Sequence, residues 1–195
     1  LKMIGMHGSA YANYSVQESD CIIALGSRFD DRTTGVISKY APHARKKNQL
    51  IHVNIENSEF NKILDTDYNI QLDCGQFLQE ITPQIKFKPR TEWLNYINEL
   101  KDEHPFEYTK AENNKIKTQS VLCELNKQTI NKDNYIFTMG VGNHMMMSCQ
   151  FIDWKRPKQV IASGSLGVMG CSNGYAMGAQ LANPDFKVVS IDGDG

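Results

Sequence analysis

Short apolar runs that stop abruptly at glycine or at polar residues restrict the fold of this chain more than any other feature. Residues 21–26 (CIIALG) and 49–55 (QLIHVNI) are two such runs. Their length and near-continuous apolar character are typical of strands buried on both faces of a parallel sheet. A third strand is predicted at residues 68–73, after a helix at 58–64 with Ser58 as its N-cap. This alternation predicts an α/β unit.

A second unit of the same kind is predicted in the C-terminal half. It opens with a helix at residues 118–129, whose buried stripe is formed by Val121, Leu122 and Leu125. Further strands are predicted at residues 135–140, 159–163 and 187–192. The stretch 172–182 is rich in glycine and alanine, which lets a helix approach a neighbouring backbone or ligand closely.

The two units are separated by a helix and a polar stretch. Residues 91–103 place Trp93, Ile97 and Leu100 on one helical face, with Thr91 as the candidate cap. The predicted fold is therefore α/β, with two consecutive three-layer units that have mainly parallel sheets, the second one truncated. We expect one domain at residues 1–90, a connecting helix and linker at 91–117, and an incomplete second domain at 118–195.

Charge and cysteine content narrow the kinds of ligand. Lys and Arg total 21 against 22 Asp and Glu, and no basic stretch predicts a nucleic-acid or membrane surface. No span approaches the roughly 20 apolar residues that cross a bilayer. The five cysteines lie far apart and are odd in number, which disfavours a disulfide framework. We expect a small-molecule ligand and an intracellular, reducing compartment.

Polar clusters follow the predicted strands, where open α/β sheets bind their ligands. After the first strand, one arginine could hold a pyrophosphate while an acid fixes the other; a solvated turn with local ion pairs is an equal alternative. The cluster consists of Ser27, Arg28, Asp30, Asp31 and Arg32. After the second strand, Asn54 and Glu56 occupy the region where an acid usually contacts ribose hydroxyls, and at two residues apart they are expected on the same strand face.

The last residues, IDGDG at 191–195, form a turn that could hold a phosphate or a metal ion. Such a site needs ligands that this chain does not contain. A start at Leu1 and an end inside a ligand turn lead us to expect a piece of a longer polypeptide. His7 and His144 stand beside glycines, which favours loop residues over catalytic bases.

Taken together and in order, the segments GMHGSAYAN, IIALGSRFDDRTTG, GVGNHMM, GSLGVMG and IDGDG resemble the acetolactate (acetohydroxyacid) synthases, a thiamine-diphosphate-dependent family. The resemblance covers the whole chain. It implies the C-terminal part of a central FAD-binding domain, followed by the start of a thiamine-diphosphate-binding domain.

The resemblance also implies site residues. FAD would contact Gly5, Met6, His7, Gly26, Ser27, Arg28, Asp30, Arg32, Asn54, Ile55, Asp73 and Met146. Thiamine diphosphate would contact Val141, Gly142, Asn143, His144, Gly167, Met169, Gly193, Asp194 and Gly195. Asp194 would be the first protein ligand of Mg²⁺, and an asparagine further along would complete the site. The activating glutamate belongs to the family's N-terminal domain, so this chain holds no catalytic residue and is expected to be inactive alone.

The implied reaction condenses pyruvate, with loss of CO₂, with a second 2-oxo acid, pyruvate or 2-oxobutyrate, in branched-chain amino-acid synthesis. The implied protein is a homodimer or homotetramer, with a possible regulatory subunit. It would be cytoplasmic in a prokaryote and mitochondrial or plastid in a eukaryote.

Departures from the family pattern concentrate in the second unit. Ser165 and Asn143 replace a usual glycine and glutamine, and the residues from Ser172 to Ala176 replace Gly-Leu-Pro-Ala-Ala. Loss of a first-turn proline weakens helix preorganisation. Two alternatives therefore stay open: another thiamine-diphosphate carboligase or decarboxylase, and a diverged, non-catalytic FAD-binding paralogue.

Overall fold

A computed structural model describes residues 1–113 and 115–194 of the chain. It divides into two compact units, residues 1–105 and 106–195. In its described residues each unit has one sheet of three parallel strands flanked by helices. The prediction of two consecutive α/β units with parallel sheets is confirmed. The finer limits 1–90, 91–117 and 118–195 stay a prediction.

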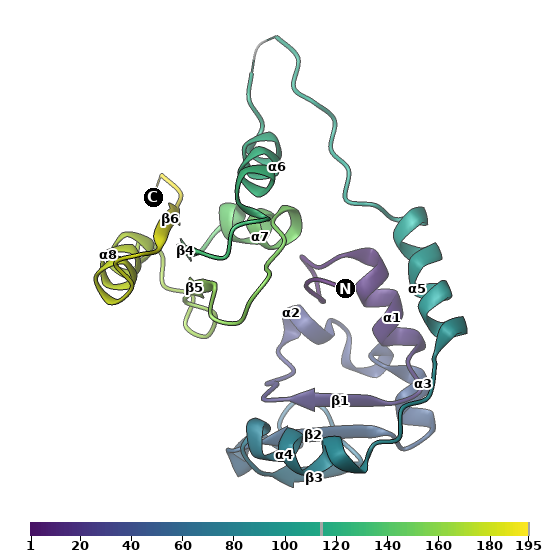
Figure 1. Ribbon diagram of the computed structural model, residues 1–195. Coiled ribbons are helices and arrows are strands. Elements are labelled where there is room, and N and C mark those ends of the chain that lie inside the picture. Colours follow the sequence, from purple (N-terminus) through teal and green to yellow (C-terminus); the bar gives the residue numbers. More distant parts are fainter. Residues whose placement is uncertain (114, 195) are drawn as a thin grey trace. The chain divides into compact units, whose positions relative to one another are not determined.

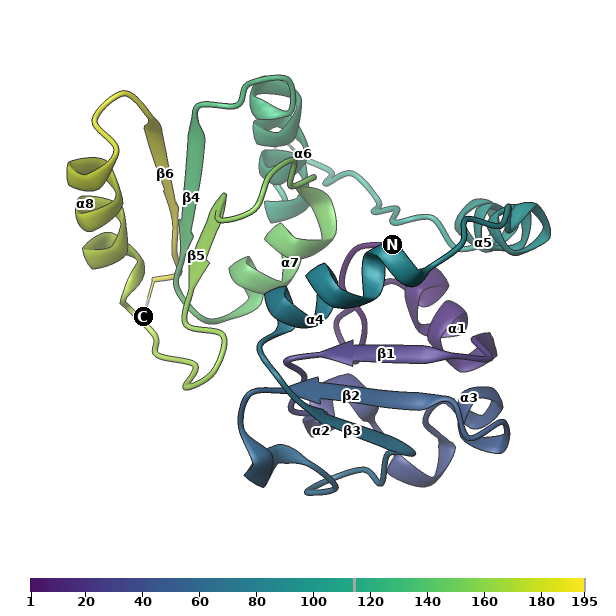
Figure 2. The same cartoon turned by 60° about the horizontal axis from the view of Figure 1, so that its bottom comes forward.

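The sheet of the first unit has the strand order β1-β2-β3. The strands are β1 (Ile22–Leu25), β2 (Leu50–Asn54) and β3 (Tyr68–Gln71), and each coincides with a predicted strand. Register pairs Leu25 with Val53 and Asn54 with Gln71. Because every pair is parallel, the three carboxyl ends meet at one edge of the sheet (Figure 2). Of the predicted flavin residues, those at 26–32, Asn54, Ile55 and Asp73 follow the ends of these strands.

Helices surround this sheet (Figure 1). They are α1 (Ala10–Glu18), α2 (Asp31–Thr34), α3 (Pro42–Lys46), α4 (Cys74–Ile81) and α5 (Thr91–Glu103). Helix α1 packs against α3 and α5, and α4 packs against β2. The core joins strand residues to the loops, and its buried members are Ala24, Phe29, Tyr40, Ala41, Ala44, Leu50 and Leu64.

The predicted helix at 58–64 is wrong. Only a single 3-10 turn forms, at Asn57–Glu59, and it is capped by the Glu56 side chain. Asn61 adopts a left-handed conformation (φ 54°), and its Oδ1 accepts a hydrogen bond from the Thr66 amide at 2.9 Å. An asparagine side chain that bonds to nearby backbone in this way competes with helix formation.

Four helices of the first unit, α1 to α4, were not anticipated, although α1 and α4 carry standard N-caps. Ser9 Oγ accepts from the Ala12 amide at 3.2 Å and begins α1. Asp73 Oδ1 accepts from the amides of Gly75 and Gln76 and begins α4. Helix α5 was anticipated, but its cap residue is Arg90 rather than Thr91, which is the first helical residue.

The second unit is a three-layer arrangement. Its strands are β4 (Tyr135–Met139), β5 (Val160–Ala162) and β6 (Lys187–Ile191), in the order β5-β4-β6. Its helices are α6 (Thr118–Thr129), α7 (Asn143–Phe151) and α8 (Ser172–Ala182). Figures 1 and 2 show α8 on one side of the sheet, against β6 and β4, and the pair α6 and α7 on the other.

The centre of the second unit is strand β4. Phe137 is 1% exposed and lies edge-on to Trp154, with the ring centroids 5.2 Å apart. Leu122 is buried as expected, but Val121 is 53% exposed, so the predicted stripe of α6 is wrong at that position.

None of the helices in the described part of the chain is long and apolar enough to cross a membrane.

We expect Phe137→Ala to lower the free energy of unfolding by about 3–5 kcal/mol, because it opens a cavity at a fully buried aromatic position. Urea denaturation would measure the change. Leu181→Ala in the same unit is the matched control: Leu181 is 84% exposed, so its loss should cost less than about 0.5 kcal/mol. Equal effects of the two substitutions would contradict the burial described above.

Candidate cofactor-binding sites

A pocket of about 740 Å³ lies at the carboxyl ends of β4 and β6 in the second unit. Small-molecule sites commonly have volumes of about 300–1,000 Å³. Its lining includes Val141, Gly142, Asn143, His144, Met169, Gly193 and Asp194, all predicted as thiamine-diphosphate residues. Gly167 lies in the turn nearby but is not among the lining residues, and Gly195 lies outside the described residues. Met146, predicted as a flavin contact, lines this same pocket.

The N-terminus of α7 opens into the pocket. Gly142 is its N-cap residue, and no described side chain caps the helix. The first amide N–H groups of an uncapped helix seek an acceptor, and the helix dipole favours a negative one. His144 belongs to the first turn of α7, so the expectation that it is a loop residue is wrong. This end of the pocket suits an anionic group.

Asp192 connects three elements at the base of the pocket. Its Oδ2 accepts a short hydrogen bond from the Ser172 hydroxyl at the start of α8, and its Oδ1 accepts from the Gly193 amide at 3.1 Å. The Oδ1 atom lies 3.5 Å from Nε2 of His144, a buried nitrogen with no hydrogen bond in the described part of the chain. The Ser172 hydroxyl, and then the Gly193 amide, lower the pKa of Asp192 from its ordinary value.

The start of α8 is tied to β6 by further polar contacts. Ser172 Oγ lies 2.9 Å from Ser190 Oγ, and the Ser190 hydroxyl donates to Asn173 Oδ1 at 3.3 Å. The carbonyl of Ser172 accepts from the Thr138 hydroxyl on β4 at 3.1 Å. Sequence inspection treated Ser172 and Asn173 only as departures and did not identify them as contacts of the site. The sequence feature that could have identified them is a pair of polar side chains at positions where the family pattern given above has Gly-Leu.

Close packing against Asp192 accounts for a glycine at position 140. A Cβ on Gly140 would lie 1.9 Å from Asp192 Oδ1 and 2.8 Å from its Cγ. The Gly140 amide also donates to the carbonyl of Ile191 at 3.2 Å, which joins the ends of β4 and β6. Asp192, which lines the pocket, is therefore packed directly against the backbone at the end of β4.

The metal-binding capacity of this pocket rests on Asp194. No group of three or more His, Cys, Asp or Glu side chains within residues 1–113 and 115–194 could hold a metal ion. Asp194 is exposed and lines the pocket beside the uncapped helix end. Mg²⁺ in proteins commonly takes one or two carboxylates and completes its shell with water and ligand phosphates. One exposed carboxylate in the same pocket as an uncapped helix N-terminus fits that pattern.

In the first unit, residues 26–32 form a fixed loop at the carboxyl edge of the sheet. Gly26 has φ 61° and donates its amide to Val53 O at 2.8 Å. Phe29 also has a positive φ of 49°, and its ring is 4% exposed. Asp30 caps α2, since its Oδ1 accepts from the Thr33 amide at 3.1 Å. The loop thus buries Phe29 and leaves its charged neighbours outside.

Both arginines of this loop pair with adjacent acids. Arg28 lies 3.6 Å from Asp30, with the side chains 48% and 42% exposed. Arg32 Nη1 lies 2.7 Å from Asp31 Oδ2, and this hydrogen bond lowers the pKa of Asp31. Exposed pairs of this kind contribute little to stability, so a pyrophosphate could displace the acids as partners of the arginines.

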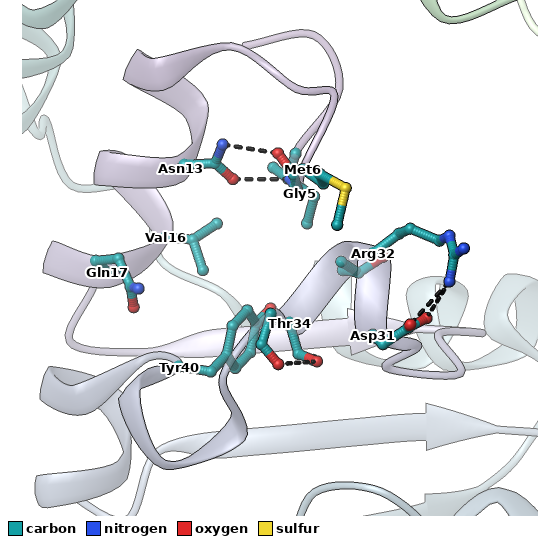
Figure 3. Close-up of a pocket in the computed structure, with 12 residues that line it drawn as sticks. Gly5, Met6, Asn13, Val16, Gln17, Asp31, Arg32, Thr34 and Tyr40 are labelled. Atoms are coloured by element: carbon teal, nitrogen blue, oxygen red, sulfur yellow. Dashed lines mark hydrogen bonds and ion pairs between the residues drawn. The ribbon is translucent and has the colours of Figure 1, made fainter.

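A cavity of about 340 Å³ lies between α1, residues 4–6 and the α2 segment at residues 31–35 (Figure 3). Asn13 on α1 holds Gly5 at both ends: Gly5 N donates to Oδ1 at 2.7 Å, and Nδ2 donates to Gly5 O at 2.9 Å. Met6 N donates to Arg32 O at 2.7 Å. A Cβ on Gly5 would meet that carbonyl at 2.2 Å. Asn13 was not identified from the sequence, since nothing local marks an asparagine within a helix.

The remaining predicted flavin residues are spread along the same edge. Asn54, at the end of β2, is 7% exposed; its Nδ2 donates to Ser27 O at 3.3 Å and its Oδ1 accepts from the Glu56 amide. Ile55 is 69% exposed. Asp73 follows β3 and caps α4, and His7 belongs to the turn after Gly5. Because β2 ends at Asn54, Glu56 does not share its strand face as predicted.

We expect Gly140→Ala to lower the free energy of unfolding by about 1–3 kcal/mol, because the added methyl group must displace Asp192. Gly164→Ala is the matched control in the same unit, since a Cβ there meets nothing within 4 Å. Thermal and urea unfolding of the two variants should differ accordingly. A Gly140→Ala protein as stable as the control would contradict the close approach of Asp192.

Comparison with known proteins agrees with this geometry. The family description "Thiamine pyrophosphate enzyme, central domain" matches residues 1–81, and "Thiamine pyrophosphate enzyme, C-terminal TPP binding domain" matches residues 140–195. Over its whole length the chain is 40% identical to the mitochondrial acetolactate synthase catalytic subunit of Saccharomyces cerevisiae and 41% identical to the mitochondrial acetolactate synthase of Schizosaccharomyces pombe. It is 38% identical to the large subunit of acetolactate synthase isozyme 1 of Escherichia coli. The chain spans 29%, 30% and 34% of the length of these three relatives. It therefore belongs to the thiamine pyrophosphate enzymes, with sequence similarity to acetolactate synthase catalytic subunits throughout.

Proposed function

We propose that this chain forms the C-terminal part of the central domain and the first part of the thiamine-diphosphate domain of an acetolactate synthase catalytic subunit. The observation that carries the proposal is the pocket at the ends of β4 and β6, where Asp194 lies beside the uncapped end of α7. The similarity to acetolactate synthases over both units supports the same assignment. The substrates would be pyruvate and a second 2-oxo acid, and the product a precursor of branched-chain amino acids.

Each side of the second-unit pocket would take a different part of thiamine diphosphate. The amides at the start of α7 would hold diphosphate oxygens, and Asp194 would be a ligand of Mg²⁺. Met169 is 64% exposed and lines the pocket, so its side chain offers an apolar surface for a ring. When bound, the cofactor supplies the electron sink for decarboxylation and condensation. The described residues would bind and orient it.

The first unit would hold FAD along the carboxyl edge of its sheet. Arg28 and Arg32 would exchange their exposed acidic partners for the pyrophosphate. The 340 Å³ cavity beside Gly5 and Met6 would take one portion of the dinucleotide. Because the proposed reaction transfers no net electrons, FAD would act structurally. The protein would assemble as a homodimer or homotetramer, and a regulatory subunit could join it.

In the whole synthase, Asp194→Ala should reduce acetolactate formation at least about a hundredfold at millimolar Mg²⁺, because the metal loses its carboxylate ligand. A colorimetric acetolactate assay across Mg²⁺ concentrations would measure the loss. Asp185→Ala, an exposed acid in the same unit, should leave activity within about twofold. Undiminished activity of the Asp194→Ala protein would disprove the assignment of the metal site.

Replacing both Arg28 and Arg32 with alanine should release most of the flavin from the purified synthase, because the pyrophosphate loses both guanidinium partners. The ratio of absorbance at 450 nm to protein concentration after gel filtration would measure retained flavin. Arg90→Ala is the control: it also removes an exposed cation from the first unit, but outside the loop at 26–32. Stoichiometric flavin in the double variant would show that this loop does not bind it.

A further inference from the structure

His52 is the one histidine of the first unit that is fully buried, at 1% exposure, and the cofactor contacts proposed above do not use it. It stands in the middle of β2, paired in register with Ala24 on β1. The ring lies edge-on to Phe29 and to Phe60, with centroid separations of 5.0 and 5.1 Å. A buried imidazole among aromatic rings needs a reason, because polar groups are costly to bury without partners.

The hydrogen bond of His52 gives that reason. Its Nε2 lies 2.8 Å from the carbonyl oxygen of Ser27, the first residue of the loop after Gly26. A carbonyl can only accept, so Nε2 carries the proton and donates it. The other ring nitrogen, Nδ1, is buried with no hydrogen-bond partner in the described residues. The bond to Ser27 is therefore the one hydrogen bond that the described residues give this ring.

Two side chains of β2 converge on the same carbonyl. Asn54 Nδ2 donates to Ser27 O at 3.3 Å, beside the His52 bond, and a carbonyl oxygen has two lone pairs. The loop is further fixed on its other side, because Ser27 Oγ accepts from the Phe29 amide at 3.1 Å. Phe29 in turn packs on the His52 ring. The backbone of residues 26–29 is therefore held at a carbonyl, a hydroxyl and a buried ring.

We propose that His52, through its Nε2–H bond to the Ser27 carbonyl, is a positioning residue for the pyrophosphate-binding loop, and that it preorganises Arg28 to contact FAD. The role in FAD binding rests on the proposed function, whereas the hydrogen bonds that fix the loop are independent of it. A loop that is fixed before binding loses less conformational entropy when the ligand associates. Removing the His52 hydrogen bond should therefore weaken flavin binding. His52 itself does not contact the ligand.

Three variants of the whole synthase separate positioning from general stability. His52→Phe keeps an aromatic ring against Phe29 and Phe60 but removes the donor, whereas His52→Gln keeps an N–H donor. Leu50→Ala, on the same strand at its opposite end, deletes a fully buried side chain away from the loop. We expect His52→Phe to raise the Kd of the apoprotein for FAD about tenfold, which corresponds to the loss of one buried hydrogen bond. His52→Gln should restore the Kd to within about threefold of the wild-type value. Leu50→Ala should lower the Tm but leave the Kd for FAD unchanged.

A second measurement does not depend on the flavin. Hydrogen–deuterium exchange of the peptide covering residues 26–34 should be about tenfold faster in His52→Phe and unchanged in Leu50→Ala. Should His52→Phe fail to fold, Asn54→Ala removes the second donor to the same carbonyl and should also speed this exchange. A wild-type apoprotein that binds no FAD would disprove the proposed flavin function, and the exchange data would still decide whether His52 fixes the loop. Equal exchange in all variants, or a Kd within twofold of wild type in His52→Phe, would overturn the proposal.

Discussion

Parallel strand pairing is the constraint on which the rest of this structure depends. In each unit every described strand pair is parallel, so the polar residues that follow different strands gather at a single edge. In the first unit this brings the loop after β1, Asn54 and Asp73 together. In the second it brings Gly140 and Gly142 next to Asp192 and Asp194. Segments far apart in the sequence form a site because their strands point the same way.

At both edges the charged groups proposed to contact the ligands are exposed, while side chains that hold the neighbouring backbone are buried. Arg28 and Asp194 lie at the surface, whereas His52 and Ser172 are 1% and 0% exposed. A site that must exchange its partners needs accessible charges, but it also needs a fixed backbone, which exposed polar contacts cannot supply. The partly buried hydrogen bonds from His52 to the Ser27 carbonyl and from Ser172 to Asp192 supply it. Both edges therefore combine exposed charged groups with buried side chains that fix the backbone, although the residues differ.

The sequence was sufficient to predict the strands, the two α/β units and the residues at the strand ends. These follow from patterns within a few residues, such as an apolar run ended by Gly26. The contacts among the strand ends were not predictable in this way, because they join residues from distant segments. Asn13 reaches Gly5 from within a helix, and His52 reaches Ser27 from 25 residues away. The helix expected at 58–64 failed for a different, local reason, since the side chain of Asn61 bonds to the backbone of Thr66 five residues on.

The substitutions at the start of α8 illustrate how a departure from a family pattern can change in meaning once its contacts are known. Judged by helix propensity, losing a first-turn proline and gaining Gly174 weakens the helix by roughly 1 kcal/mol or less. In the folded unit, however, Ser172 is fully buried and donates to Asp192, and Asn173 accepts from Ser190. Each such bond contributes about 0.5–1.5 kcal/mol, and more when the acceptor is charged. The side chains that replaced Gly-Leu thus offset the weaker helix start, and they do so by anchoring the carboxylate that lies against His144 and Gly140.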